Sequence, residues 1–287
     1  SSFFDEHRGT ALGIAMAGTG IGTAILPQIL QFLIDEHGWR TAYLALAALM
    51  VGIALPSVLF LLRDPGDKSV AAEPTIAPVA GELPGIEAKQ ALTSRTFWLL
   101  AIVVFLVASV VYGVIVHAVP FLTDAGVPAA QAATVLIAAG MSTLVGRLLS
   151  GFLVDRIFAP FVGIFFFMLA ILGLYLFGAN VNPVIGMIFI GLASGAEIDL
   201  IGYLTSRYFG VKRFGLLYGL MFTVFAAGCA FGPFVMGFTY GADQSYDRAF
   251  IGFAIALIVA CAILLTLGKY AYPIVKKEKS AAEAKPA

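Results

Sequence analysis

Residues 8–43 read RGTALGIAMAGTGIGTAILPQILQFLIDEHGWRTAY, and a similar stretch, RFGLLYGLMFTVFAAGCAFGPFVMGFTYGADQSYDRAF, follows at 213–250. Each copy begins at an Arg, runs through a Gly-rich apolar span with a late Pro, and turns through an acidic loop to a second Arg. The copies align at one constant spacing: Gly13 with Gly219, Gly22 with Gly228, and Pro27 with Pro233. Such long-range repetition is a signature of proteins built by internal duplication.

The composition indicates a chain whose solvent is a lipid bilayer. Of its 287 residues, 60% are hydrophobic and 12% are charged, and the mean hydropathy is +0.97. A soluble domain of this length has too little interior to bury so much apolar surface. The net charge of zero gives no reason to expect a nucleic-acid partner. We therefore expect an integral membrane protein.

The apolar residues form long continuous runs, which favours helices over a β-barrel, because barrel strands alternate. A bilayer core needs about 20 apolar residues per helix. Charge-free runs of that size cover 9–34, 41–62, 96–123, 125–146, 157–196, 214–242 and 249–268. The fifth run is double length and is broken at Gly178 to Pro183, so the sequence predicts an all-α protein with eight transmembrane helices.

The basic residues are distributed unequally between the two sides of these spans. With a cytoplasmic N-terminus, all but three of the 17 Lys and Arg residues face the cytoplasm. Arg40 and Arg248 fall outside, and Arg147 lies within a span. The positive-inside rule therefore predicts a multi-pass protein of the cell (inner) membrane with both ends of this chain in the cytoplasm. Cys229 and Cys261 lie inside spans, where free thiols act as small hydrophobes.

The internal repeat also predicts how the helices are grouped. If the first helix pair corresponds to the last pair, one repeat unit holds six helices. This chain then contains the last two helices of one six-helix half and the complete second half. We expect four further N-terminal helices, which an upstream reading frame with four apolar spans would reveal. The alternative is a natural eight-helix protein.

The segment 63–95 is rich in Pro, Gly, Ala and Glu and has no periodic apolar run, so we expect a cytoplasmic linker there. The sequence thus divides into 1–62, the last two helices of the N-terminal half; 63–95, the linker; 96–272, the six-helix C-terminal half; and 273–287, a cytoplasmic tail.

Arg147 is the most informative charged residue, because it lies within an apolar span. It lies about 12 Å along a helix from Asp155, and an unpaired cation at that depth in lipid costs several kcal/mol. A guanidinium binds a carboxylate through two parallel hydrogen bonds and stays charged. We expect Arg147 to face a cavity and to contact an anionic ligand. The alternatives are a structural ion pair and a side chain that reaches back to the interface.

Glu197 and Asp199 lie near the middle of the sixth span. Two residues apart on a helix, they point about 200° away from each other, so we do not expect one paired site. A carboxyl group in a low-dielectric interior favours its protonated form and releases the proton when wetted, as proton coupling requires. Both are candidates for that role: we expect Glu197 to be the coupling acid, neutralised by Arg147 when the site is empty, and Asp199 to be a structural partner. The alternative is two structural acids bound to backbone or to hydroxyls such as those of Tyr203 and Thr205.

Other polar residues in the spans are candidates for the lining of the same cavity. We expect Tyr112 and Gln28 to contribute to substrate binding, and Gln31 is a further candidate. His117, near the outer face, is more typical of a packing or hydrogen-bonding residue than of a functional one.

Short motifs in a consistent order resemble those of the major facilitator superfamily. Gly151-x-Leu153-x-Asp155-Arg156 lies in the cytoplasmic loop two helices into the second half, where that family carries its loop signature. Further motifs resemble its monocarboxylate and oxalate/formate branch: Arg8-Gly9, Gly38-Trp39-Arg40, Arg95-Thr96-Phe97-Trp98 and Gly228-x-x-x-Gly232-Pro233. The resemblance implies a major-facilitator-type bundle in which the eight spans correspond to the fifth through twelfth helices of a twelve-helix transporter.

The resemblance also implies a role for Arg147. In the carboxylate-transporting branch an Arg at this station of the eighth helix contacts the substrate anion, and Gly146-Arg147-x-x-x-Gly151 matches the local pattern. The oxalate-handling relatives use a second cation, a Lys in the eleventh helix, but 214–242 contains no Lys. This departure favours a monocarboxylate or a larger apolar organic acid over a dicarboxylate.

The loop motif has a physical interpretation of its own. Gly151 lets two helices approach closely. Asp155 at a helix C-terminus is disfavoured by the macrodipole unless it pairs with Arg156 or caps a neighbouring helix. We expect Gly151, Asp155 and Arg156 to form a gating latch on the cytoplasmic face. The alternative is an ordinary solvated turn.

The sequence therefore predicts a secondary active carrier of small organic anions that is coupled to protons or works by exchange, with alternating access across the bilayer. Two alternatives remain: a non-transporting sensor on the same fold, and a carrier of a non-anionic metabolite or drug. A membrane-embedded enzyme is not expected, because the sequence has no His or Cys metal cluster and no Gly-x-Ser-x-Gly motif. We expect neither a metal nor a cofactor.

Overall fold

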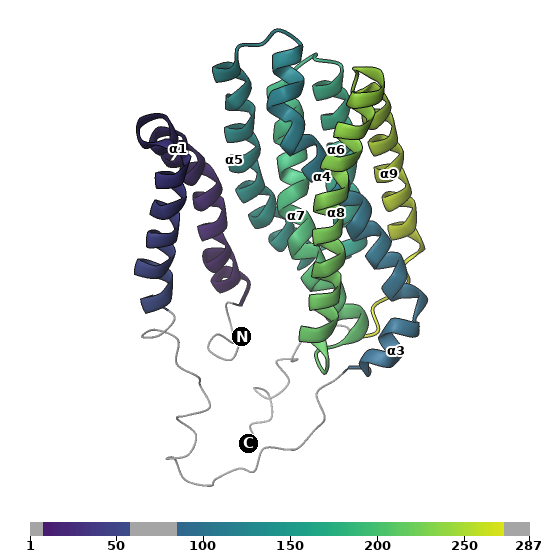
Figure 1. The fold of residues 1–287 in the computed structure, drawn as a ribbon. Coiled ribbons are helices and arrows are strands. Elements are labelled where there is room, and N and C mark those ends of the chain that lie inside the picture. Colours follow the sequence, from purple (N-terminus) through teal and green to yellow (C-terminus); the bar gives the residue numbers. More distant parts are fainter. Residues whose placement is uncertain (1–7, 58–84, 273–287) are drawn as a thin grey trace, which may run out of the picture.

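Figure 1 shows a computed structural model in which a bundle of long helices has a helical hairpin at its side. The structure describes residues 8–57 and 85–272, without the side chains of 8–25 and of residues 27, 28, 31, 54, 129 and 130. These two ranges contain helices and one isolated β-bridge, and no strand. The all-α class predicted from the sequence is confirmed.

The helices follow one another as α1 (Arg8–Leu49), the π-helical turn η1 (Met50–Ala54), α3 (Ala88–Thr93), α4 (Arg95–Asp124), α5 (Ala129–Val154), α6 (Ala159–Gly178), α7 (Pro183–Phe209), α8 (Phe214–Asp243) and α9 (Asp247–Thr266). Side chains cap two of the long helices: Ser94 accepts from the backbone N of Phe97 at 3.2 Å, and Asn182 accepts from the backbone N of Ile185 at 3.1 Å. Each cap satisfies a backbone donor that the first turn leaves free.

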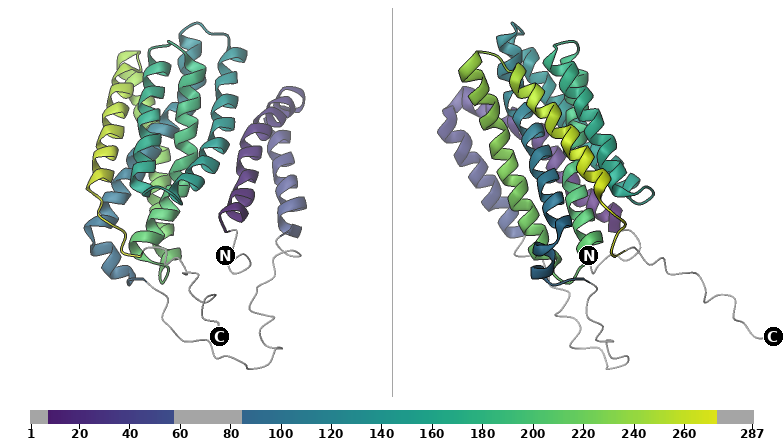
Figure 2. Two further views of the ribbon diagram at one scale, coloured as in Figure 1. Left: turned by 180° about the vertical axis from the view of Figure 1, so that it is seen from behind. Right: turned by 90° about the vertical axis from the view of Figure 1, so that its right-hand side faces the viewer.

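α1 is a hairpin rather than one rod. Gly38 interrupts the helix with φ +79°, a conformation that favours glycine, and the chain reverses there (Figures 1 and 2). Gln244, which ends α8, also has a positive φ, of 52°. The two turn residues stand at the same spacing as the repeated glycines and prolines, so the internal repeat of the sequence is also a repeat of backbone conformation.

Seven helical segments in the described ranges are long and apolar enough to cross a bilayer. Six of them lie in α4 to α9, and the seventh, Phe32–Ser57, runs through the turn at Gly38 into the second arm of the hairpin. The predicted span 9–34 consists largely of residues for which the structure describes the backbone but not the side chains. Helices α5 and α7 continue past the charged residues at which the predicted runs 125–146 and 157–196 stop.

Glycines set the closest helix crossings in the bundle. α8 packs along α4, where a Cβ added at Gly232 would strike the carbonyl group of Ser109. α5 packs along α7, where a Cβ added at Gly195 would lie 2.8 Å from the backbone N of Arg147. These neighbours are backbone atoms, so no side-chain movement would relieve the clash. Two other glycines of α8, Gly215 and Gly219, have nothing within 4 Å of an added Cβ.

The N-terminal hairpin lies beside the bundle and contacts it through α5. Figure 2 shows the hairpin next to α5 when the molecule is seen from behind, as it is in Figure 1. α5 therefore has the hairpin on one side and α7 on the other, which places it between the two parts of the chain.

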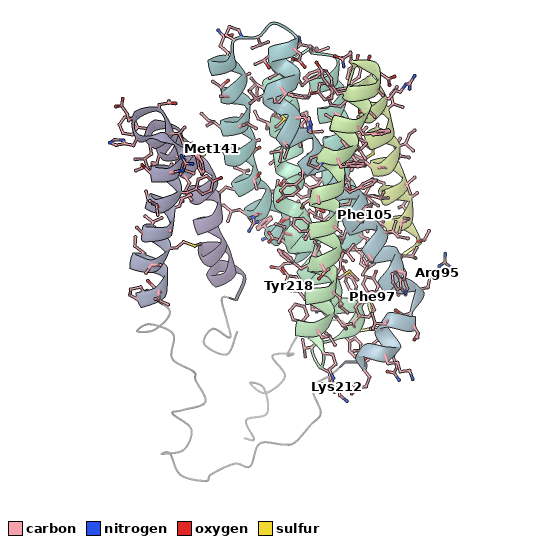
Figure 3. All side chains as sticks on the ribbon, in the orientation of Figure 1. Arg95, Phe97, Phe105, Met141, Lys212 and Tyr218 are labelled. Carbon is pink, nitrogen blue, oxygen red and sulfur yellow. The ribbon has the colours of Figure 1, made fainter. Side chains whose placement is uncertain are left out.

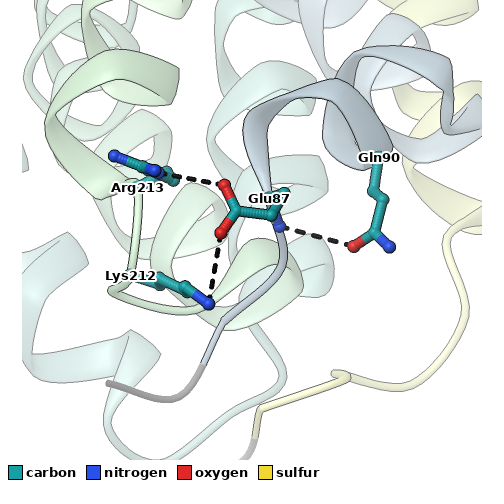
Figure 4. A network of polar contacts seen from close by, with 4 residues as sticks. All are labelled: Glu87, Gln90, Lys212 and Arg213. Carbon is teal, nitrogen blue, oxygen red and sulfur yellow. Dashed lines mark hydrogen bonds and ion pairs between the residues drawn. The ribbon is translucent and has the colours of Figure 1, made fainter. Parts of the chain in front are cut away.

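A short strap, residues 85–93, ties the start of α4 to the loop between α7 and α8. The backbone N of Ile86 donates to the carbonyl oxygen of Phe209 at 3.1 Å. Glu87 accepts from Lys212 and from Arg213, each at 3.1 Å (Figure 4). Gln90 accepts from the backbone N of Glu87, which fixes the first turn of α3. The strap thus connects two segments that are far apart in sequence.

Candidate functional site

Arg147 lies where α5 and α7 pack most tightly. Besides the contact of Gly195 with Arg147, a Cβ added at Gly146 would strike the carbonyl group of Leu192. Further along, the backbone of Val154 in α5 accepts a hydrogen bond from Tyr203 in α7. The two helices therefore run in the same direction with matching turns, and Arg147 lies beside the turn of α7 that carries the acidic residues.

The Arg147 side chain is half-buried, and its Nε and Nη1 atoms are buried without a hydrogen-bond partner. Within the described ranges, ion pairs are formed elsewhere, at Glu87 and at Arg248. The structure thus gives no support to Arg147 as a structural ion-pair partner within the part of the chain it describes. Because an unpaired cation in a low-dielectric interior costs several kcal/mol, the guanidinium is suited to an anion that comes from outside the chain.

Asp199 follows Gly195 by one helical turn, so it lies on the same face of α7, the face that packs against α5. The hydroxyl of Ser150 donates to Oδ2 of Asp199 at 3.2 Å. Arg147, one turn before Ser150, interacts electrostatically with Asp199, although no ion pair within 4 Å is formed between them. We call Arg147, Ser150 and Asp199 the polar cluster. It joins a cation, a hydroxyl and a half-buried carboxyl group at one helix crossing.

Glu197 lies on the opposite face of α7, as the two-residue spacing predicted. It is 2% exposed, and neither of its carboxyl oxygens has a hydrogen-bond partner. It lines a cavity of ≈ 20 Å³, which is space for about one water molecule. The other walls are mostly apolar, with Leu100, Phe167, Met221 and Leu264 contributed by four other helices. The predicted neutralisation of Glu197 by Arg147 is not seen, because the carboxyl oxygens are without a partner.

The hydroxyls that could have satisfied the two acids are bound elsewhere. Tyr203 donates to the carbonyl of Val154 at 3.0 Å, and Thr205 donates to the carbonyl of Ile201 at 2.6 Å. The alternative in which these hydroxyls hold Glu197 or Asp199 is therefore wrong for this conformation. Only Ser150 serves either acid among the described side chains.

The structure places the remaining candidates at different distances from the polar cluster. Tyr112 in α4 packs edge-on against Phe225, with ring centroids 5.6 Å apart, and interacts electrostatically with both Glu197 and Arg147. Gln28 belongs to the first arm of α1, and its side chain lies outside the described residues. Nδ1 of His117 lies 3.3 Å from the carbonyl oxygen of Gly113, which agrees with the predicted packing role.

The loop motif after α5 shows neither interaction that a latch requires. Asp155 is exposed, and its side chain takes part in no hydrogen bond or ion pair within the described ranges. Arg156 instead places its guanidinium 3.6 Å from the ring centroid of Phe152. A Cβ added at Gly151 would meet nothing within 4 Å, so the prediction of a close helix contact at Gly151 is wrong here. The latch itself stays a prediction.

Tyr218 is a neighbour of the polar cluster that sequence reasoning missed. Its ring lies against α7 at Gly202, where an added Cβ would be 3.5 Å from the ring, and it interacts electrostatically with Asp199 and Arg147. Figure 3 labels it on the lower half of α8. The sequence signal for Tyr218 is its position in a series of aromatic residues that follow one another at about one turn along α8.

Comparison with known proteins gives consistent matches. The sequence profile of the Major Facilitator Superfamily matches residues 1–196. Human monocarboxylate transporter 11 is 27% identical over 88% of this chain and 54% of its own length, and monocarboxylate transporter 12 of Xenopus laevis is 26% identical over 93% and 63%. Bovine monocarboxylate transporter 13 is 25% identical over 93% of this chain and 62% of its own length. The chain thus spans between about half and less than two thirds of these curated relatives.

A solved structure shares the fold. The crystal structure of FucP, a Major Facilitator Superfamily transporter in the outward conformation, matches with a TM-score of 0.56 and 18% identity. The match covers 79% of this chain and 54% of FucP. At this identity the likeness concerns the architecture alone.

Proposed function

Because the chain belongs to the major facilitator superfamily, we propose that the protein is a secondary active transporter of small organic anions, monocarboxylates in particular. The relatives with the names monocarboxylate transporter 11, 12 and 13 match over about nine tenths of this chain. The protein lies in the cell (inner) membrane with both ends of this chain in the cytoplasm. Residues 1–62 and 96–272 belong to two halves that move against each other, joined by the linker 63–95.

One observation carries the proposal: two guanidinium nitrogens of Arg147 are buried and unpaired between membrane-spanning helices. A planar guanidinium takes a carboxylate through two parallel hydrogen bonds, which would supply the missing partners. One cation and no Lys in α8 suit one carboxylate rather than two. Tyr112 in α4 and Gln28 in α1 are proposed to complete the substrate site from neighbouring helices.

We propose that the polar cluster couples substrate transport either to the movement of a proton or to the exchange of one anion for another. Asp199 lies beside Arg147 and holds a hydrogen bond from Ser150, so a proton on its carboxyl group and an anion on Arg147 can influence each other at short range. Glu197 occupies an apolar cavity on the far side of α7. The sequence favoured Glu197 for coupling, and the geometry favours Asp199. Glu197 remains the second candidate, and Gly151, Asp155 and Arg156 remain the proposed cytoplasmic gate.

The test uses the complete gene product that contains this chain, reconstituted in vesicles with and without an imposed pH gradient. Uptake of labelled lactate is expected to fall at least about tenfold in Arg147→Gln and to recover only in part in Arg147→Lys, which keeps the charge but loses the planar fork. Asp199→Asn is expected to abolish stimulation by the gradient while anion exchange continues. Glu197→Gln serves as the comparison for the second acid.

Two results would point to the alternatives. Uptake of a neutral or cationic solute that ignores both the gradient and Arg147→Gln would favour a carrier of a non-anionic metabolite or drug. Specific binding of an anion without any uptake would favour a non-transporting sensor. Unchanged lactate uptake in Arg147→Gln would overturn the assignment of the anion site.

A further inference from the structure

The cytoplasmic half of α8 carries a row of aromatic rings. Phe214 and Tyr218 are stacked with ring centroids 5.5 Å apart and planes 17° apart. Phe222 follows at 6.2 Å from Tyr218, and Phe225 at 5.3 Å from Phe222. The row ends at Tyr112 in α4, which meets Phe225 edge-on. Four successive aromatic side chains thus lead along the helix to a residue already proposed for the substrate site.

The row passes close to the polar cluster. Tyr218 rests against α7 at Gly202, and Gly202 follows Asp199 by one turn on the face that Gly195 presents to α5. Tyr218 also lies within electrostatic range of Asp199 and Arg147. One face of α7 therefore has the guanidinium and the carboxyl group at one level and the aromatic ring of Tyr218 at the next.

The space beside Tyr218 is open. Gly215, one turn before Tyr218, and Gly219, directly after it, have nothing within 4 Å of an added Cβ. Phe222 is 44% exposed, and Tyr218 is half-buried with no hydrogen bond from its hydroxyl group within the described ranges. A flat group could lie along this part of α8 without displacing a side chain that the structure describes.

The other end of α8 provides a built-in comparison. Phe234 and Phe238 are stacked in the same way, with ring centroids 6.1 Å apart and planes 24° apart. They are 64% and 67% exposed. This pair has the surroundings of lipid-facing rings, whereas Tyr218 rests against α7 at Gly202, one turn from Asp199.

We propose that the aromatic row of Phe214, Tyr218 and Phe222 forms the apolar wall of the substrate site, and that the substrate is a monocarboxylate with an aromatic body. Its carboxylate lies on Arg147 and its ring lies on Tyr218. Offset stacking and edge-on contacts between rings favour this class over small aliphatic acids. The inference rests on the proposed function, because it uses Arg147 as the anion ligand.

The experiment compares ligands that differ only in the ring. Binding of propionate, 3-phenylpropionate and 3-cyclohexylpropionate to the complete purified gene product is measured by calorimetry in lipid nanodiscs. The wild-type protein is expected to bind 3-phenylpropionate at least about tenfold more tightly than propionate, and more tightly than the non-planar cyclohexyl acid. Equal affinity for the phenyl and cyclohexyl acids would overturn the inference without the need for any variant.

Matched variants locate the effect. Tyr218→Leu keeps an apolar side chain and is expected to lower affinity for 3-phenylpropionate about tenfold while propionate binding is retained. Phe238→Leu makes the same kind of change at the other stacked pair and is expected to change neither, which controls for partition into lipid. An equal loss in the two variants, or no loss in Tyr218→Leu, would sink the inference.

A third variant separates this inference from the proposed function. Arg147→Gln is expected to lose both acids, because both depend on the guanidinium. If Arg147→Gln loses both acids and Tyr218→Leu changes neither, the aromatic site is wrong and the anion site stands. If Arg147→Gln still binds both acids with wild-type affinity, the proposed function itself fails.

Discussion

Arg147 and Glu197 both have buried polar atoms without partners, but their surroundings differ. Arg147 is half-buried and shares a helix crossing with Ser150 and Asp199. Glu197 is enclosed almost completely by apolar side chains. Arg147 can therefore bind a ligand that is not part of the chain. Glu197 can exchange little more than a proton or a single water molecule.

The isolation of Glu197 makes its cost to stability measurable. A buried polar group without a partner destabilises a fold by about 1–3 kcal/mol. Glu197→Met has a similar length without the polar atoms, so it is expected to raise the free energy of unfolding by that amount. The readout is the thermal unfolding midpoint of the purified protein in detergent.

Glu197→Gln is the matched control for this prediction. It keeps two polar atoms in the same cavity and is expected to give no gain. A lower midpoint for Glu197→Met than for wild type would mean that the carboxyl group has a partner in solution, such as a bound water.

At the residue scale, the sequence predicted which charged residues lie within a span, but not which neighbouring helix each acid faces. The position of Arg147 inside a span and the opposite orientation of the two acids both follow from helix periodicity. Which acid would face α5 depended on how α7 rotates when Gly195 meets the backbone of α5, and no local pattern encodes that rotation. The place of Tyr218 depended on the same packing.

At the scale of helices, glycines divide into packed and open ones. Gly232 meets the backbone of α4, whereas Gly219, on the same helix, meets nothing within 4 Å. Gly232→Ala is expected to destabilise the protein by about 1–3 kcal/mol, because the clash is with backbone. Gly219→Ala is expected to be neutral or to stabilise by up to about 1 kcal/mol through helix propensity. Thermal unfolding of both variants checks the contrast, and an equal loss would show that a further partner covers Gly219.

The strap of residues 85–93 gives the second prediction at this scale. Hydrogen bonds from Lys212 first, and then from Arg213, hold the pKa of the Glu87 carboxyl below its ordinary value of 4.5. Because the folded pKa is the lower one, the ion pairs stabilise the strap above pH 4.5, and this contribution is lost as the pH falls through the folded pKa. Protease cleavage near residue 85 is therefore expected to accelerate below pH 4.5.

Glu87→Gln provides the control for the strap. It should be cleaved faster than wild type at pH 7, and the difference should vanish in acid, where both side chains are neutral. The effect should also weaken at high salt, since the Glu87 side chain is 47% exposed to solvent and salt screens exposed charges. Equal cleavage of Glu87→Gln and wild type at pH 7 would show that the backbone contact to Phe209, rather than the charges, holds the strap.

Helix existence was predictable and helix ends were not. Charge-free runs found the cores of α4, α8 and α9 closely, because their ends coincide with charged turns. They stopped short in α5 and α7, where the helix continues through Arg147 and Glu197. These extensions carry the candidate site, so the rule that found the spans failed where charged residues lie within membrane-spanning helices.

At the scale of the whole molecule, the alternating helices sort the loops into two ends. α3 and the loops after α5 and α7 share one end, and the turn at Gly38 and the loops after α4, α6 and α8 share the other (Figures 1 and 2). The repeat that the sequence showed at 8–43 and 213–250 reappears as two helices that each end at a positive φ. We predict the orientation in the membrane from charge, because Arg156, Lys212 and Arg213 gather at the end that carries α3.

The last prediction tests that orientation with single cysteines. The native Cys229 and Cys261 are free thiols and are first replaced by Ala. Val211→Cys lies at the basic end, and Asp247→Cys lies at the other; both positions are exposed. Basic loops resist translocation, so in right-side-out vesicles a membrane-impermeant maleimide is expected to label Asp247→Cys at once and Val211→Cys only after permeabilisation. The reverse pattern would place the basic end outside and would contradict the proposal that Arg156 and its loop form a cytoplasmic gate.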